Sequence, residues 1–188
     1  YSLANAPHDD AFLQLHLRYQ ANGEFSRYVF ETLKPRDILR FQGPLGTFFL
    51  REDSDKPIIF IASGTGFAPV KSILEHMFQQ HSDRQIVFYW GGRTLRDLYM
   101  LPLAQEWQNT HPNLTFIPVL SEPERGVVWL GRTGMVHQAV LDDFDSLAGY
   151  QVYACGAPIM VEAAHTAFTQ TRALPEHEFF SDAFFNTK

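Results

Sequence analysis

The chain has 188 residues, of which 45% are hydrophobic and 19% are charged, a composition typical of a folded domain and not of a disordered segment. Its net charge of -6 argues against nucleic acid as a main partner, because phosphate backbones are bound by basic surfaces. The single cysteine, Cys155, excludes an internal disulfide framework and a four-thiolate cluster within this sequence. The longest apolar run, 58–62, is too short to span a bilayer, and a cytoplasmic location is expected.

The first 52 residues have the pattern of short antiparallel strands. Apolar and polar side chains alternate over 11–19, which predicts a strand with one buried face. Ser26 is expected to be the N-cap of a short helix over 27–33. Two more short strands are expected at 38–42 and 47–50. This first part of the sequence therefore predicts a domain made of the later strands of an antiparallel β-barrel.

Residues 53–188 change to an alternation of buried strands and helices. Continuous apolar runs predict strands that are buried on both faces, as in a parallel sheet. We expect strands at 57–62, 85–90, 114–120, 151–155 and 178–180, and helices that end near 80 and that span 97–108, 133–141 and 158–171. This alternation predicts an α/β domain with a doubly wound parallel sheet.

The strongest local motif is a glycine-rich turn that follows the first of these strands and opens a helix. Gly64 and Gly66 allow a tight turn and a close approach of the backbone to a ligand, and Pro69 suits a first helical turn. The free amides and the dipole of the helix would then face a pyrophosphate. In this strand–turn–helix context, phosphate binding is favoured over a plain connecting loop.

Several segments, in order along the chain, carry a resemblance to one family. They are Tyr1-Ser2-Leu3-Ala4-Asn5, Gly23-x-x-Ser26, Gly64-Thr65-Gly66-Phe67-Ala68-Pro69, Tyr153-Ala154-Cys155-Gly156-Ala157-Pro158 and Phe179-Phe180-Ser181-Asp182-Ala183-Phe184. In this combination and spacing the chain resembles the ferredoxin-NADP reductase-like proteins. A further segment, Trp90-Gly91-Gly92-Arg93 with Asp97-Leu98-Tyr99, is most similar to bacterial flavin reductases and to reductase components that feed oxygenases or sugar dehydrases.

The resemblance implies FAD as one cofactor. Tyr1 would stack on the isoalloxazine ring, and Ser2 would hydrogen-bond the flavin N5, where the hydride arrives. Gly23 and Ser26 would lie at the flavin pyrophosphate. Asp182 and Phe184 belong to the C-terminal motif that closes over the flavin. Plain structural interpretations stay open: Tyr1 as a surface aromatic, Ser2 as a strand-end hydroxyl, Ser26 as a helix cap, Asp182 as a solvated acid and Phe184 as part of the core.

The resemblance implies NAD(P)H as the second cofactor. Gly64, Thr65, Gly66 and Pro69 would hold its phosphates, and Cys155 and Gly156 would lie beside its nicotinamide. Cys155 also fits a plain core position, but the end of a parallel strand is where ligands bind. Ser2, Cys155 and Asp182 are therefore the residues expected at the reacting atoms, where Cys155 and Asp182 would shape the site without acting as nucleophiles.

Arg93 is open to two interpretations. It could pair with Asp97 one helical turn on, or it could meet the adenosine end of the dinucleotide. No acid stands at the end of the second strand, where a partner for the ribose 2′-hydroxyl is expected, so NADH and NADPH both remain open. The resemblance to reductase components favours NADH. The histidines lack the spacing of a metal site, and none is assigned.

The expected reaction is hydride transfer from NAD(P)H to FAD, followed by electron transfer to an iron–sulfur domain or acceptor protein outside this chain. Two alternatives stay open: a reductase that releases reduced flavin, and a dinucleotide-binding module that catalyses nothing. Because the sequence begins inside its first motif, we expect a preceding segment that completes the barrel and supplies an arginine before Tyr1. The first 50 residues supply too few strands to close a barrel and would leave its edges open, so the 188-residue chain as given is expected to hold FAD weakly or not at all.

Overall fold

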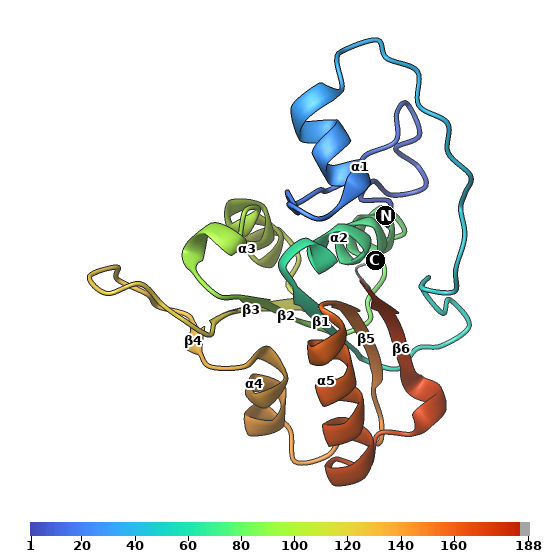
Figure 1. Cartoon of the computed structure of the whole chain (residues 1–188). Coiled ribbons are helices and arrows are strands. Elements are labelled where there is room, and N and C mark those ends of the chain that lie inside the picture. The colour runs from blue at the N-terminus through green and yellow to red at the C-terminus, as the bar shows by residue number, and fades with distance from the viewer. Residues whose placement is uncertain (185–188) are drawn as a thin grey trace.

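A six-stranded sheet forms the centre of the protein in the computed structural model, which describes residues 1–184. All strands pair in parallel, in the order β4-β3-β2-β1-β5-β6 (Figure 1). The strands are β1 (Ile58–Ser63), β2 (Ile86–Gly92), β3 (Leu114–Leu120), β4 (Arg132–Thr133), β5 (Gln151–Gly156) and β6 (Phe179–Ala183). The predicted α/β class with a doubly wound parallel sheet is confirmed.

Helices cover both faces of this sheet. They are α2 (Phe67–Gln79), α3 (Leu101–Thr110), α4 (Val136–Asp143) and α5 (Pro158–Thr171), whereas α1 (Glu24–Arg27) lies in the N-terminal segment. Helices α2 and α3 share one core with one face of the sheet, and α4 and α5 share a second core with the other face (Figure 1). The other described elements are short 3-10 helices at Gly64–Gly66, Leu95–Asp97 and Glu176–Glu178 and a π-helix at Tyr28–Thr32.

The side chains of β1 explain why this strand lies in the middle of the sheet. Phe60 and Ala62 belong to the core under α2 and α3, whereas Ile59 and Ile61 belong to the core under α4 and α5. All four are fully buried, and β1 is paired on both edges, with β2 and with β5. Burial of each large apolar side chain contributes about 1.5–3 kcal/mol, so a continuous apolar run is most stable in this position.

The order of the strands reverses between β1 and β5. From β1 the chain proceeds to β2, β3 and β4 on one side, and it then returns to place β5 and β6 on the other side. The segment after β1 leads into α2 on one face of the sheet, and the segment after β5 leads into α5 on the opposite face. In open parallel sheets a ligand crevice forms at such a reversal, outside the carboxyl ends of the strands.

Residues 1–52 contain less regular structure than the sequence predicts. The strands expected at 11–19, 38–42 and 47–50 do not form, and the described pairing here is one isolated antiparallel bridge between Leu3 and Leu15. A strand needs a continuous hydrogen-bonded partner, and residues 1–184 supply only the bridge at Leu15 to the first of these segments and no strand partner to the other two. Helical structure begins at Glu24, earlier than the expected residue 27, and continues from α1 into the π-helix.

The N-terminal segment is nevertheless fixed to α2, which lies beside it in Figure 1. The Nζ atom of Lys71 donates to the carbonyl of Ala4 at 3.1 Å, and the hydroxyl of Ser72 donates to the carbonyl of Asn5 at 2.9 Å. Ala4 is fully buried and Asn5 nearly so. These contacts hold the start of the chain against the helix that follows the glycine-rich turn.

Three element boundaries differ by three residues or more from those expected in 53–188. Strand β6 continues to Ala183, which places Asp182 within the sheet. The helix expected from 97 begins at Leu101, because Thr94 and Asp97 form a capping box around a separate 3-10 turn. The helix expected from 133 begins at Val136, because the two residues of β4 join the sheet. Across residues 1–184, no helix has the length and apolar character needed to cross a membrane.

Candidate functional site

The glycine-rich turn lies at the carboxyl end of β1 and leads directly into α2. Gly64 has a φ of +51°, and a Cβ there would meet no atom within 4 Å, so this residue borders open space. Thr65 follows in the same 3-10 turn, and Pro69 lies in the first turn of α2, as predicted. The first amides of a helix have no carbonyl one turn earlier, so this turn offers N–H donors and a positive dipole end to an anion.

Gly66 permits a close approach of a different kind. Gly66 is buried, and a Cβ at this position would overlap the backbone carbonyl of Cys155. The absence of a side chain therefore lets the start of α2 pack against the end of β5. The turn and the Cys155-Gly156 segment, which the sequence places at one ligand edge, are brought into direct contact.

The end of β5 is built to fit the end of β1. Gly156 has a φ of +126°, and a Cβ there would overlap Ser63, the last residue of β1. The Ser63 hydroxyl accepts a hydrogen bond of 2.9 Å from the backbone N–H of Ala157. The two glycine-containing segments thus form one continuous edge at the reversal between β1 and β5.

The N-terminal and C-terminal motifs meet at this edge. The hydroxyl of Ser2 donates to the Asp182 carboxylate at 2.6 Å, and Asp182 lies opposite Cys155 in the pairing of β6 with β5. The backbone N–H of Phe184 donates to the carbonyl of Gly156 at 2.8 Å. The structure therefore brings together Ser2, Cys155 and Asp182, the residues expected at the reacting atoms.

The electrostatic environment of Cys155 makes its thiol a weak nucleophile. Burial raises the pKa of the Cys155 thiol well above its ordinary value, and the negative charge of Asp182 raises it further. A thiol is nucleophilic only as the thiolate, so Cys155 stays protonated and unreactive near neutral pH. This agrees with the expectation that Cys155 shapes the nicotinamide pocket without acting as a nucleophile.

The residues expected on the flavin side lie near the start of the chain. Tyr1 is 71% exposed, and the centre of its ring lies 5.2 Å from that of Phe25 in α1. The prediction that Ser26 caps the helix is wrong, because the N-cap is Gly23 and Ser26 lies within α1. The Ser26 hydroxyl donates to the carbonyl of Gln20 at 2.9 Å and accepts from its N–H at 3.0 Å. Buried Ser26 therefore fastens the turn before α1.

Arg93 lies apart from the other expected residues, just beyond β2. Its side chain does not pair with Asp97, because its Nε and Nη2 atoms donate to the two carboxylate oxygens of Glu122, each at 3.0 Å. Asp97 instead accepts from the backbone N–H of Arg93 at 3.0 Å and pairs with Arg18 at 3.2 Å. Glu122 follows β3, the neighbour of β2, so a carboxylate lies beside the end of β2.

Sequence reasoning gave no role to Glu122, or to Trp90 and Tyr99 beyond their place in the segment that resembles flavin reductases. The indole N–H of Trp90 donates to the carbonyl of Gly64 at 3.0 Å. The hydroxyl of Tyr99 and Nδ1 of His16 hydrogen-bond at 2.8 Å, which joins the N-terminal segment to the loop after β2. A tryptophan at the carboxyl end of a buried strand was a usable signal, whereas the partners of Glu122 and Tyr99 are distant in the sequence.

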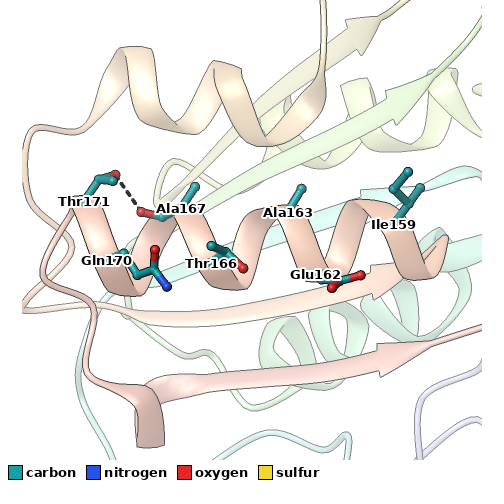
Figure 2. A pocket seen from close by; sticks show the side chains of 7 residues that line it. All are labelled: Ile159, Glu162, Ala163, Thr166, Ala167, Gln170 and Thr171. Atoms are coloured by element: carbon teal, nitrogen blue, oxygen red, sulfur yellow. Dashed lines mark hydrogen bonds between the residues drawn. The ribbon is translucent and has the colours of Figure 1, made fainter.

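A shallow hollow of about 360 Å³ lies elsewhere, along α5 (Figure 2). Its lining side chains, which include Ile159 and Thr171, all come from this one helix. No glycine lines this hollow, whereas glycines distinguish the edge between β1 and β5. We therefore place the candidate site at that edge.

Comparison with known proteins gives two family matches along the chain. Residues 60–166 match the oxidoreductase NAD-binding domain, and residues 1–50 match the oxidoreductase FAD-binding domain. The chain is 46% identical over 188 residues to a CDP-6-deoxy-L-threo-D-glycero-4-hexulose-3-dehydrase reductase from Yersinia pestis, covering 100% of this chain and 56% of the relative. It is 46% identical to the protein RfbI of Salmonella typhimurium, covering 98% of this chain and 54% of the relative.

A shorter relative and a solved structure match as well. An NAD(P)H-flavin reductase from Aliivibrio fischeri is 35% identical, with 98% of this chain and 79% of the relative covered. The crystal structure of the Amycolatopsis cytochrome P450 reductase GcoB has a TM-score of 0.88 at 34% identity, covering 98% of this chain and 55% of that one. The chain thus spans about half the length of most of these relatives.

Proposed function

The chain belongs to the ferredoxin-NADP reductase-like family of FAD- and NAD-binding oxidoreductases, and we propose that it is part of a flavoprotein reductase. In the proposed reaction NAD(P)H reduces FAD by transfer of a hydride, and uptake of one proton gives NAD(P)⁺ and FADH₂. The flavin, when bound, accepts the hydride and then delivers two electrons, with release of two protons, to an acceptor. The residues of this chain bind, orient and shield the reactants.

The observation that carries the proposal is the fitted edge between β1 and β5. Gly64 borders open space at a helix start, and Gly66 packs on Cys155, so a phosphate-binding turn adjoins the segment proposed for the nicotinamide. A dinucleotide would lie along this edge, with its phosphates at Gly64, Thr65 and the first turn of α2, which includes Pro69. Cys155 and Gly156 would border its nicotinamide end.

The residues on the N-terminal side fit a flavin ring in two respects. Tyr1 offers an exposed aromatic face, and the adjacent Ser2 offers a hydroxyl that is held at the same edge by Asp182. We propose that Tyr1 stacks on the ring, that Ser2 donates to it near the reacting atom, and that Asp182 and Phe184 shield it from water. Gly23 and Ser26 are proposed to lie at the flavin pyrophosphate.

We propose that residues 1–52 belong to the flavin-binding domain and residues 53–188 form the nicotinamide-binding domain. The change from irregular segments to strand–helix alternation supports this division. The electron acceptor would be an iron–sulfur domain or a separate protein outside this chain. The match to the Yersinia pestis dehydrase reductase supports a protein acceptor of this kind. A cytoplasmic location completes the proposal.

A second candidate is a reductase that releases reduced flavin. The match to the Aliivibrio fischeri NAD(P)H-flavin reductase favours it, because this chain covers 79% of that protein. In that case FAD would be a diffusible substrate and no protein acceptor would be needed. A binding module that catalyses nothing would leave the paired Ser2 and Asp182 at the site without a use.

One titration of the intact protein tests these candidates. The flavin absorbance of the purified, FAD-loaded protein is followed while NADH or NADPH is added without oxygen. The proposal expects stoichiometric bleaching of a flavin that stays with the protein through gel filtration, and recovery of its colour when a ferredoxin-type acceptor is added. Flavin that elutes separately after reduction would select the second candidate. A flavin that neither dinucleotide bleaches would contradict both.

A further inference from the structure

The carbonyl of Gly64 is held by two donors in the protein. One is the backbone N–H of Phe67 at the end of the 3-10 turn, and the other is the indole N–H of Trp90 at 3.0 Å. Trp90 is the fifth residue of β2 and is fully buried, so its donor reaches Gly64 from the core. A carbonyl oxygen has two lone pairs, and these two donors occupy both.

The direction of this carbonyl fixes the direction of the next amide. Gly64 and Thr65 share one planar trans peptide unit, in which the C=O and the N–H point to opposite sides. With the Gly64 oxygen held by a buried indole, the N–H of Thr65 is directed away from the core. A Cβ at Gly64 would meet no atom within 4 Å, so the turn borders open space at this peptide unit.

The turn needs such a restraint because of its composition. Glycine has more backbone freedom than any other residue, and Gly64 and Gly66 flank Thr65. Gly66 is fixed by its packing on Cys155, whereas Gly64 has no atom near its open side. The hydrogen bond from Trp90 is the side-chain restraint on the Gly64 peptide among the described residues.

We propose that Trp90 is a positioning residue that orients the Thr65 amide toward the pyrophosphate of the nicotinamide dinucleotide. This inference rests on the proposed function, because it assumes that the turn binds a dinucleotide. Trp90 would act through Gly64 and would not touch the ligand. Its effect would therefore be confined to donors that carry phosphates and would be absent for a hydride donor without them.

The aromatic packing of Trp90 is a separate contribution that the test must control. Its ring lies 4.3 Å from that of Phe67 and 5.4 Å from that of Tyr99. Trp107 in α3 is a matched control, because it is also buried and its ring stacks on Phe67 at 5.6 Å. In the described part of the chain, Trp107 makes no hydrogen bond to residues 64–66.

The experiment compares Trp90→Phe with Trp107→Phe in the intact, FAD-loaded protein. Affinity for ADP-ribose is measured by calorimetry, thermal unfolding reports stability, and steady-state rates are measured with NADH and with 1-benzyl-1,4-dihydronicotinamide, which has no phosphate. We expect Trp90→Phe to weaken ADP-ribose binding and raise KM for NADH about three- to tenfold, the effect of one lost hydrogen bond. Its kcat and its rate with the phosphate-free donor should stay near those of the wild type.

The alternatives give different results. A merely structural role predicts that both variants lose stability and that both, or neither, lose ADP-ribose affinity; either result would overturn the proposal. If Trp90→Phe does not fold, replacement of Trp90 by 3-benzothienylalanine, which keeps the shape and lacks the N–H, decides the question by the same titration. Failure of the wild-type protein to bind ADP-ribose would instead overturn the proposed function, and the role of Trp90 with it.

Discussion

The hydroxyl of Ser2 donates a 2.6 Å hydrogen bond to the carboxylate of Asp182, across a separation of 180 residues. Asp182 is the register partner of Cys155 at the candidate site, so this bond holds the start of the chain beside the carboxyl ends of the parallel strands. A short bond to an ionised acceptor is stronger than one between neutral groups. The N-terminal segment and strand β6 thus meet where β1 and β5 end.

Replacement of Ser2 by Ala should slow the reduction of the flavin. The variant removes the hydroxyl proposed to face the flavin and also leaves Asp182 without its donor. We expect the rate of flavin bleaching by NADH in stopped flow to fall about tenfold, the effect of losing about 1.4 kcal/mol at the transition state. Ser181→Ala, an exposed neighbour on β6, is the control and should react like the wild type. An unchanged rate in Ser2→Ala would remove Ser2 from the site.

The two glycines of the turn should respond differently to substitution. Gly66→Ala forces a Cβ into the carbonyl of Cys155 and should lower the free energy of unfolding by about 3 kcal/mol. Gly64→Ala meets no atom but must keep a positive φ, which costs about 1–2 kcal/mol. Urea denaturation measures both. Equal losses for the two variants would contradict the packing role of Gly66.

The sequence predicts most of the parallel sheet because all of its strands except the two-residue β4 are defined by a local apolar pattern. The apolar run of β1 is buried on both faces, and the same reasoning locates β2, β3 and β5 to within a few residues. The strands expected in 1–52 fail because an alternating pattern such as 11–19 gives a strand only where a partner pairs with it. The pattern of apolar residues within a segment does not show whether a second strand is present to pair with it.

The site is predicted in part for a similar reason. Gly64, Cys155 and Asp182 belong to segments whose position after or within a strand is visible in the sequence, and the structure brings these segments together. The motif does not reveal that Gly66 packs on Cys155, because that contact depends on how α2 sits against β5. The partners of Ser26 and Arg93 likewise depend on folded geometry and differ from those expected.

Acidification should weaken the attachment of the N-terminal segment. Burial lowers the pKa of His16 from its ordinary value of 6.5, and the nearby charge of Lys71 lowers it further. Burial also raises the pKa of Tyr99, so Tyr99 keeps its proton and donates to neutral His16. Between the lowered pKa and 6.5 the unfolded chain binds more protons than the folded one, so stability falls as the pH falls through this window.

The measurement is the urea midpoint at about pH 7.5 and about pH 5.5. The wild type should lose more stability between these values than His16→Asn, which can still accept the Tyr99 hydrogen bond but does not titrate. His81→Asn, a histidine in the turn after α2, should behave like the wild type. A pH dependence that persists unchanged in His16→Asn would contradict this prediction.

The thiol of Cys155 should be nearly inert in the folded protein. Burial and the Asp182 carboxylate raise its pKa, so little thiolate exists at neutral pH. We expect alkylation by iodoacetamide to be on the order of 100-fold slower than in the same protein unfolded in urea. Mass spectrometry of the peptide that carries Cys155 measures both rates. Rapid labelling in the folded state would show that the thiol is accessible and ionised, contrary to its proposed role.

The pair of Arg93 and Glu122 should influence the choice between NADH and NADPH. Arg93 follows β2, at the end of the sheet where the adenosine ribose lies in dinucleotide-binding folds, and both oxygens of Glu122 occupy its guanidinium. Glu122→Ala would free Arg93 to bind a 2′-phosphate and would remove a carboxylate that repels it. We therefore expect the ratio of kcat/KM for NADPH to that for NADH to rise about tenfold or more. Glu124→Ala, an exposed acid in the same loop, should leave the ratio unchanged, and Arg93→Ala combined with Glu122→Ala should abolish the gain. A ratio that does not move in Glu122→Ala would place the adenosine away from this pair.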